Sequence, residues 1–470
     1  MSSVAVTLIS VLLAAPLTIQ PDGVAAIDGK RTFILGLYEN PKEDSVLKDV
    51  AAAGFNIVAA TEDQAALDRL HASGLYAWIN TGNRVDFSDA RPDREAKLKE
   101  MVDKYAQHPA LIAWEVPDEA LWNCYFPAAE WRIGKEPKQQ RELIAALTDP
   151  ALKEKLSTLR ADADRETQTA NYVKAEQIAD DIWKQLGKEQ PQPGVNYSFG
   201  PQAAAKLEAG MVEGYQRLKE LDSKHPIWMN YAPRNLPEQL AGFAKAADIV
   251  GCDIYPVPTG ISGHTDLIDT SLSSVGAYTD RFQQAAPKKP VWMVLQGFGW
   301  GDIQPEATPE QRKIRRRPDA RESRFMAYDA IVHGARGILY WGTAHIEKDS
   351  ELWRDLLKLA RELADLQPVL TAPDAKLSPA ITFANTPGSV DRSLKVLAKN
   401  VNGKTWLLVV NEWPSGPLRY TLHGLDSLNG TRYVDAASSS EAQVARGELT
   451  LGIPAIGVHV LQPVGDAPAK

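Results

Sequence analysis

The feature that most constrains this chain is a regular alternation of short apolar runs with longer amphipathic segments from residue 32 to residue 368. The runs are rich in β-branched and aromatic residues and predict strands, whereas the segments between them have helical spacing. Eight strand–helix units favour a closed (β/α)8 barrel over an open doubly wound sheet, and no GxGxxG motif follows the first strand. The strands are predicted at 33–38, 56–60, 76–80, 111–116, 227–231, 249–255, 291–296 and 337–341, and the helices at about 43–53, 62–72, 93–106, 203–222, 237–246, 266–285, 319–333 and 350–366.

Two further regions are attached to this predicted barrel, which spans residues 19–368. Residues 120–201 lie between the fourth strand and its helix and have helical periodicity, so they predict a helical insertion at the carboxyl end of a barrel strand. After residue 366 the pattern changes to short alternating runs separated by turn residues. We therefore expect a small antiparallel, sandwich-like β-domain at 375–466.

The amino terminus resembles an export signal. Residues 4–15 form an apolar run that is too short to span a membrane, and small residues follow it, although no Lys or Arg precedes it. We expect a signal peptide at 1–18 and export to the periplasm or the medium; the alternative is an N-terminal strand packed on the body. No other run reaches eighteen apolar residues, so no membrane span is expected after the signal is removed.

Composition excludes several classes of function. The net charge of −8 provides no basic field for nucleic acid. Two cysteines, Cys124 and Cys252, cannot form a disulfide framework, although one bridge between them remains possible. The eight histidines show no metal-ligand spacing, and we expect no metal or organic cofactor.

The predicted fourth strand ends in a cluster of carboxylates. Glu115, Asp118 and Glu119 lie within five residues, where their like charges should raise at least one pKa toward the range of a general acid. The alternative is structural, because Asp118 and Glu119 could instead cap the next helix or pair with Arg84.

Other strand ends carry side chains that suit a polar substrate. Carboxylates, amides and aromatic faces at the mouth of a barrel can bind the hydroxyls and the apolar face of a sugar. The candidates besides the fourth strand are Tyr38, Glu39, Asn80, Arg84, Asn230, Tyr231, Asp253, Tyr255, Gln296, Trp300 and Trp341.

With these residues in place, the chain resembles the clan A (β/α)8 glycoside hydrolases over residues 28–368. Residues 114–119, WEVPDE, are similar to the clan's fourth-strand pattern W-E-x-x-N-E, whose final Glu is the acid/base. Residues 290–300 resemble the seventh strand, which carries the nucleophilic Glu, and Trp341 resembles the eighth-strand tryptophan beneath the reacting sugar. The resemblance implies hydrolysis of O-glycosidic bonds in an oligo- or polysaccharide, with Glu119 as general acid.

One departure limits the analogy, because Gln296 occupies the position of the nucleophile and an amide cannot form a glycosyl ester. Inversion is one remaining route, with Asp253 or Glu39 preferred over Asp302 and Glu306 as the base. A second route is substrate-assisted: Glu119 protonates the leaving oxygen while Asp118 orients a 2-acetamido group of the substrate. The third alternative is a carbohydrate-binding barrel without catalysis, in which Gln296 contacts a sugar hydroxyl.

Overall fold

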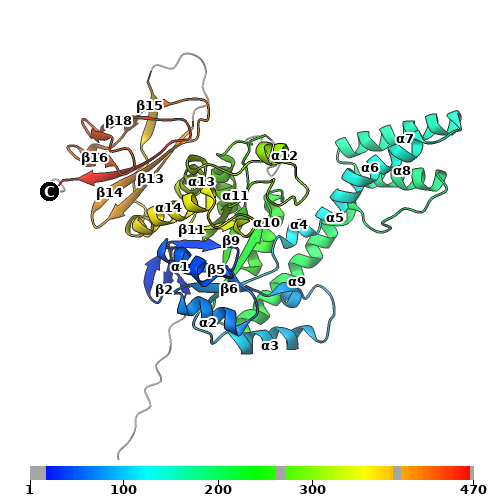
Figure 1. Ribbon diagram of the computed structural model, residues 1–470, viewed down its shortest axis with the longest axis horizontal. Helices are drawn as coiled ribbons and strands as arrows, with labels where there is room; N and C mark the ends of the chain where they lie inside the picture. Colours follow the sequence, from blue (N-terminus) through cyan, green and yellow to red (C-terminus); the bar gives the residue numbers. More distant parts are fainter. Residues whose placement is uncertain (1–16, 261–269, 385–392, 466–470) are drawn as a thin grey trace, which may run out of the picture.

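The computed structural model describes residues 17–260, 270–384 and 393–465 and contains a closed parallel barrel at its centre (Figure 1). Its eight strands are hydrogen-bonded in the order β10-β11-β4-β5-β6-β7-β8-β9, so each strand neighbours the next one in the sequence. The predicted (β/α)8 barrel is confirmed. The strands are β4 (Ile34–Leu37), β5 (Ile57–Ala60), β6 (Tyr76–Asn80), β7 (Leu111–Glu115), β8 (Ile227–Tyr231), β9 (Ile249–Asp253), β10 (Val291–Gln296) and β11 (Gly337–Trp341).

Helices surround the barrel between successive strands. The strongest amphipathic pattern belongs to α14, which buries Leu352, Leu356, Leu359 and Leu363 along one face and begins with Ser350 accepting a hydrogen bond from the Trp353 N–H. Part of the helix predicted at 266–285 lies outside the described residues. The barrel helices are α1 (Asp44–Ala52), α2 (Gln64–Ala72), α3 (Arg94–Tyr105), α9 (Gly200–Leu221), α10 (Pro237–Phe243), α11 (Ser274–Ala285), α13 (Ala320–Val332) and α14 (Glu351–Asp365), with the short α12 (Pro309–Ile314) and α15 (Gln367–Leu370) beside them.

Three tryptophans fill the inside of the barrel. Trp78, Trp228 and Trp292 are each at most 1% exposed and belong to the cluster of inward-facing side chains. Space for them comes from glycines on neighbouring strands: a Cβ on Gly251 would meet the Trp228 ring at 2.6 Å, and one on Gly337 would meet Trp292 at 2.8 Å. The interior is therefore a packed core rather than a pore.

A small sheet of β1 (Leu17–Ile19), β2 (Ala25–Ile27) and β3 (Lys30–Thr32) covers the amino-terminal end of the barrel. Leu17, Ala25 and Ile27 join the same apolar cluster as Ile34 and the barrel tryptophans. The predicted signal peptide lies outside the described residues except for its last two positions, which are part of β1.

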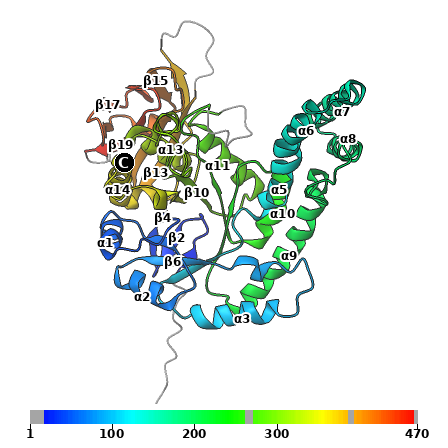
Figure 2. The same ribbon diagram turned by 45° about the vertical axis from the view of Figure 1, so that its right-hand side comes forward.

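The insertion after β7 is helical, as predicted, and projects from the barrel as an arm (Figures 1 and 2). Ile144, Leu156 and Ile182 form the core of its outer three helices. Near its base, the buried Arg132 guanidinium donates to both Glu136 and Asp180. The arm comprises α4 (Ala120–Asn123), α5 (Phe126–Ala128), α6 (Glu136–Ala145), α7 (Pro150–Gln168) and α8 (Tyr172–Gln185), with a π-helix at Ala129–Lys135.

The C-terminal domain consists of two antiparallel sheets that share one apolar core, which confirms the predicted β-domain. The larger sheet also packs on the barrel: along β14, Leu407 and Val409 face the core of the domain, whereas Leu408 and Val410 join the barrel cluster. Both faces of this strand are thus buried. The strands are β12 (Ala380–Phe383), β15 (Leu418–His423) and β18 (Glu448–Ile453) in the smaller sheet, and β13 (Leu394–Val401), β14 (Lys404–Asn411), β16 (Arg432–Asp435), β17 (Glu441–Gln443) and β19 (Val458–Val464) in the larger.

Two remaining expectations concern the cysteines and membrane spans. Cys124 and Cys252 are both free thiols, so the possible bridge between them is not formed. Within the described ranges, no helix combines the length and the apolar character that crossing a membrane requires.

Candidate active site

The carboxyl ends of the barrel strands bring polar side chains together at one end of the barrel. Successive residues of a strand face opposite sides, so the last inward position of each strand points toward the mouth. Seven predicted residues occupy this position or the one directly following a strand: Tyr38, Asn80, Glu115, Asn230, Asp253, Gln296 and Trp341.

Glu115 is a buried carboxylate held by four hydrogen-bond donors. Its Oε1 accepts from the Tyr38 hydroxyl and from Trp228 Nε1 at 3.1 Å, and its Oε2 accepts from Trp78 Nε1 at 3.1 Å and Asn80 Nδ2 at 2.9 Å. Burial raises the pKa of Glu115 to about 8, a nearby negative charge adds to the rise, and the donors oppose it. Because both of its oxygens accept hydrogen bonds, the Glu115 side chain is suited to holding the four donor side chains around it in place.

Glu119 and Asp253 form a second carboxyl pair, in which a hydrogen bond joins the two side chains. Two carboxyl groups can hydrogen-bond only if they hold a proton between them. Burial, reinforced by the charge of Asp118, raises the pKa of Glu119 to about 7, against the effect of the bond to Asp253. The pKa of Asp253, which is 3% exposed, is raised well above its usual range by burial and by Glu119. The pair therefore retains a proton near neutral pH.

Asn230 connects this pair to Asp118. Its Nδ2 donates to Asp118 Oδ1 at 2.9 Å and to Asp253 Oδ1 at 3.3 Å. Asp118 itself is exposed to solvent at the exit of β7, and Glu119 follows it with a left-handed backbone at φ 49°. This backbone is uncommon for a residue other than glycine, and the Glu119 N–H donates to the carbonyl oxygen of Asn230 at 3.2 Å.

Gln296 is fully buried, and the backbone of two loops engages its amide. Its Nε2 donates to the carbonyl oxygens of Val257 at 2.7 Å and Phe298 at 3.0 Å, and its Oε1 accepts from the Val257 N–H at 2.9 Å. These three bonds fasten the loop after β9 to the loop after β10. The amide of Gln296 is thus hydrogen-bonded to backbone. The carbohydrate-binding alternative had expected it to contact a sugar hydroxyl instead.

Aromatic rings form a wall beside the carboxyl groups. Tyr255 stacks on Trp341 with ring centroids 5.6 Å apart and planes at 21°, and Trp300 meets Tyr255 edge-on at 6.2 Å. Phe298 packs against all three rings. Trp300 and Trp341 remain partly exposed, so their surfaces are available to the apolar face of a sugar ring.

Three predicted site residues lie elsewhere or are already paired. Tyr231 is 1% exposed and packs on Phe282 of α11, because its position in β8 faces the helices. Arg84 forms a two-pronged salt bridge with Glu62 at 2.7 and 3.0 Å. Glu39 is paired with Lys348. The prediction that Tyr231 belongs to the site is therefore wrong. The side chains of Arg84 and Glu39 are already engaged in ion pairs.

Sequence reasoning missed the two tryptophan donors to Glu115 and the ring of Phe298. Trp78 and Trp228 lie two residues before Asn80 and Asn230 on the same strands, so strand alternation could have predicted that they face inward with them. Asp329, His333 and Glu412 form a group with the chemistry of metal ligands where α13 meets the C-terminal domain, and none of the three lies in a barrel strand.

This barrel, with carboxyl groups at the exit of its fourth strand and an aromatic wall beside them, defines a protein of the glycoside hydrolase barrel class. The family model for glycoside hydrolase family 42, described as beta-galactosidase, matches residues 87–352. The chain belongs to this family.

The chain is distantly similar to the following proteins. Beta-galactosidase LacZ of Lactobacillus acidophilus is 20% identical over 373 residues, which cover 74% of this chain and 53% of the relative. The chain thus spans about half the length of that relative. A glycoside hydrolase family 5 structure from Bacteroides vulgatus aligns over 96% of this chain and 93% of its own, with 14% identity and a TM-score of 0.53. The GH42 beta-galactosidase Gan42B aligns over 92% and 98%, with 10% identity and a TM-score of 0.51. Both structures share the fold.

Proposed function

We propose that this protein hydrolyses O-glycosidic bonds, with Glu119 as the general acid. The observation that carries the proposal is the hydrogen bond between the Glu119 and Asp253 side chains at the exit of β7, where burial raises the pKa of Glu119 to about 7. An acid of this pKa can donate its proton to a leaving oxygen near neutral pH. The family match and the neighbouring aromatic wall support a sugar as the substrate.

Inversion through Asp253 has little support in this arrangement. An inverting pair needs roughly 6.5–9.5 Å between its carboxyl groups so that a water molecule fits between them. Asp253 instead hydrogen-bonds Glu119 directly. Glu39 is a poor replacement for the base because its carboxylate is already paired with Lys348.

The substrate-assisted route fits the same residues better. It requires no protein nucleophile at position 296, where the amide of Gln296 is bound to backbone. Asp118 is adjacent to the acid, solvent-accessible and fixed by Asn230 at 2.9 Å, so it can orient a 2-acetamido group of the bound sugar. We therefore propose a 2-acetamido sugar as the preferred substrate class, with Asp118 as the orienting carboxylate.

The experiment must distinguish this proposal from a competing substrate and from a competing function. The relatives named beta-galactosidase make an unsubstituted β-galactoside the direct competitor. A barrel that only binds carbohydrate is the second candidate function, favoured by the absence of a carboxylate at position 296.

The test is product release from aryl β-galactosides and aryl 2-acetamido-β-hexosides by wild type, Glu119→Gln and Asp118→Asn. We expect release from the 2-acetamido substrates and a kcat reduced about 10²–10⁴-fold in Glu119→Gln, since a general acid contributes that much. The wild-type rate should fall as the pH rises through about 7, where Glu119 loses its proton.

Each result leads to a different conclusion. Release from the galactoside alone, unaffected by Asp118→Asn, would exclude substrate assistance but keep Glu119 as the acid. Full activity in Glu119→Gln would refute the acid assignment. Sugar binding without release from any substrate would identify the binding barrel.

A further inference from the structure

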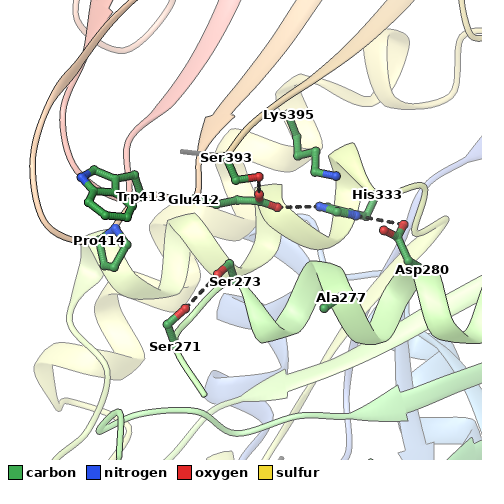
Figure 3. A pocket seen from close by; sticks show the side chains of 10 residues that line it. All are labelled: Ser271, Ser273, Ala277, Asp280, His333, Ser393, Lys395, Glu412, Trp413 and Pro414. Carbon is green, nitrogen blue, oxygen red and sulfur yellow. Dashed lines mark hydrogen bonds and ion pairs between the residues drawn. The ribbon is translucent and has the colours of Figure 1, made fainter. Parts of the chain in front are cut away.

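A pocket lies between the flank of the barrel and the C-terminal domain (Figure 3). Its volume is about 430 Å³, which lies within the usual range of small-ligand sites. Helices α11 and α13 form one side, and residues at the ends of β13 and β14 form the other. None of the lining residues belongs to the candidate active site, so this pocket is separate from Glu119 and its neighbours.

The floor of the pocket is a fixed row of charged groups. His333 Nδ1 contacts Asp280 at 2.9 Å and Nε2 contacts Glu412 at 2.8 Å, so carboxylates occupy both ring nitrogens (Figure 3). The imidazole is therefore held in place by α11 on one side and by the C-terminal domain on the other. Asp280 keeps 43% of its side chain exposed, whereas His333 and Glu412 are below 10%.

The charges of the lining suit a neutral ligand. Lys395 supplies positive charge, as does His333, whose two ring nitrogens each contact a carboxylate. Asp280 and Glu412 supply negative charge. Since both signs are present, neither an anion nor a cation is favoured. The hydroxyls of Ser271 and Ser273, which are 2.8 Å apart, add donors and acceptors. Such a lining matches a ligand rich in hydroxyl groups.

One end of the pocket is apolar. Figure 3 shows the indole of Trp413 and the ring of Pro414 at the end opposite Asp280. Trp413 is partly exposed, and it follows Glu412 directly in the chain. An aromatic face beside carboxylates and hydroxyls can stack on the C–H face of a sugar while the polar groups bind its hydroxyls.

We propose that this pocket is a second, non-catalytic carbohydrate site that binds one or two units of a neutral sugar chain. It rests on the proposed function only in that both sites take the same substrate class. A chain bound there is held on the protein at a distance from the carboxyl groups of the barrel, which raises its effective concentration at the active site.

The experiment counts sugar sites by isothermal titration of Glu119→Gln, which binds without turnover. The probes are lactose and N,N′-diacetylchitobiose. We expect two sites, of which one is lost or weakened at least tenfold when Trp413→Ala is added. Lys395→Ala, which removes a polar contact and leaves the ring, should weaken the same site. Phe199→Ala is the matched control, because Phe199 is 53% exposed and lies outside the pocket lining.

A single site that survives both pocket substitutions would overturn the proposal, as would two sites that respond equally to Trp413→Ala and Phe199→Ala. The titration measures binding and not hydrolysis, so it could still be interpreted if the protein showed no glycosidase activity. Conversely, the rate assays with the Glu119 and Asp118 variants would still test the proposed chemistry even if this pocket bound no sugar.

Discussion

The three carboxyl groups at the exit of β7 differ because each has a different set of neighbours. Glu115 has four donors, Glu119 shares a hydrogen bond with Asp253, and Asp118 is open to solvent and bound by Asn230. A cluster of like charges would be costly if all of its members were ionised in the barrel mouth. The raised pKa values of Glu115, about 8, and Glu119, about 7, keep protons on the cluster near neutral pH, which relieves this repulsion.

Replacing Glu119 should reveal the cost of its burial. The pKa of this carboxyl group is about 7 in the folded protein, against an ordinary value of 4.5 for an unperturbed Glu, so folding holds its proton more tightly. The wild type therefore loses stability as the pH rises from 4.5 to 7, and Glu119→Gln does not. We expect the variant to melt a few degrees higher at pH 8 and at the wild-type temperature near pH 4.5, by calorimetry. Equal melting temperatures at pH 8 would contradict the raised pKa.

Restoring a carboxylate at position 296 should fail to restore a nucleophile. In Gln296→Glu the carboxylate cannot donate to Val257 and Phe298, and each buried carbonyl without a donor costs about 1–3 kcal/mol. We expect a lower melting temperature and no gain in β-galactoside hydrolysis. Gln202→Glu, at an exposed position of α9, is the control for the charge change. A stable Gln296→Glu with new galactosidase activity would show that the amide is not needed as a brace.

At the scale of elements, the strands depend on small residues opposite large ones. A methyl group on Gly251 of β9 would lie 1.8 Å from the Trp292 carbonyl oxygen and 2.6 Å from the Trp228 ring. We expect Gly251→Ala to lower stability by about 1–3 kcal/mol or more, because overpacking forces the strands apart. Thermal melting followed by tryptophan fluorescence measures it. Gly416→Ala should be nearly neutral, as its Cβ would meet nothing within 4 Å.

The elements themselves were largely predictable from local pattern. Alternation and helical spacing located every barrel strand to within two residues at either end, since these periods depend on neighbours in the sequence. The sheet of β1, β2 and β3 was not predicted. Its strands have three residues each, which is too short for an alternating pattern, and their burial depends on contact with the end of the barrel.

At the scale of the whole molecule, His333, the residue that follows α13, links the barrel to the C-terminal domain. Burial alone would lower its pKa, but hydrogen bonds to Asp280 and Glu412 and the charge of Asp329 raise it to about 9. The groups that face it are Asp280 of α11, Asp329 of α13 and Glu412 of the C-terminal domain, with Lys395 at the same pocket. The docking of the two domains should therefore depend on pH.

His333→Gln tests this link. Because the pKa of His333 in the folded protein lies above its ordinary value of 6.5, the stabilisation is fully present below pH 6.5 and is lost as the pH rises through about 9. We expect the variant to be less stable than wild type by about 3 kcal/mol at pH 6, with the difference closing above pH 9. Urea denaturation at both values measures this. His423→Gln, in β15 of the smaller sheet, is the control. A constant difference from pH 6 to pH 10 would argue against the charged imidazole.

The sequence by itself determined the order of strands and helices, the helical insertion, the β-domain and the concentration of Glu115, Asp118 and Glu119 after the fourth strand. These follow from side-chain periodicity and from the placement of strand ends in a closed barrel. Only the tertiary structure decided what each residue faces. It turned Tyr231 toward α11, bound the amide of Gln296 to backbone, and joined Glu119 to Asp253 from a strand 134 positions further along the chain. Such contacts depend on the closure of the barrel, which brings distant segments together and which no local pattern encodes.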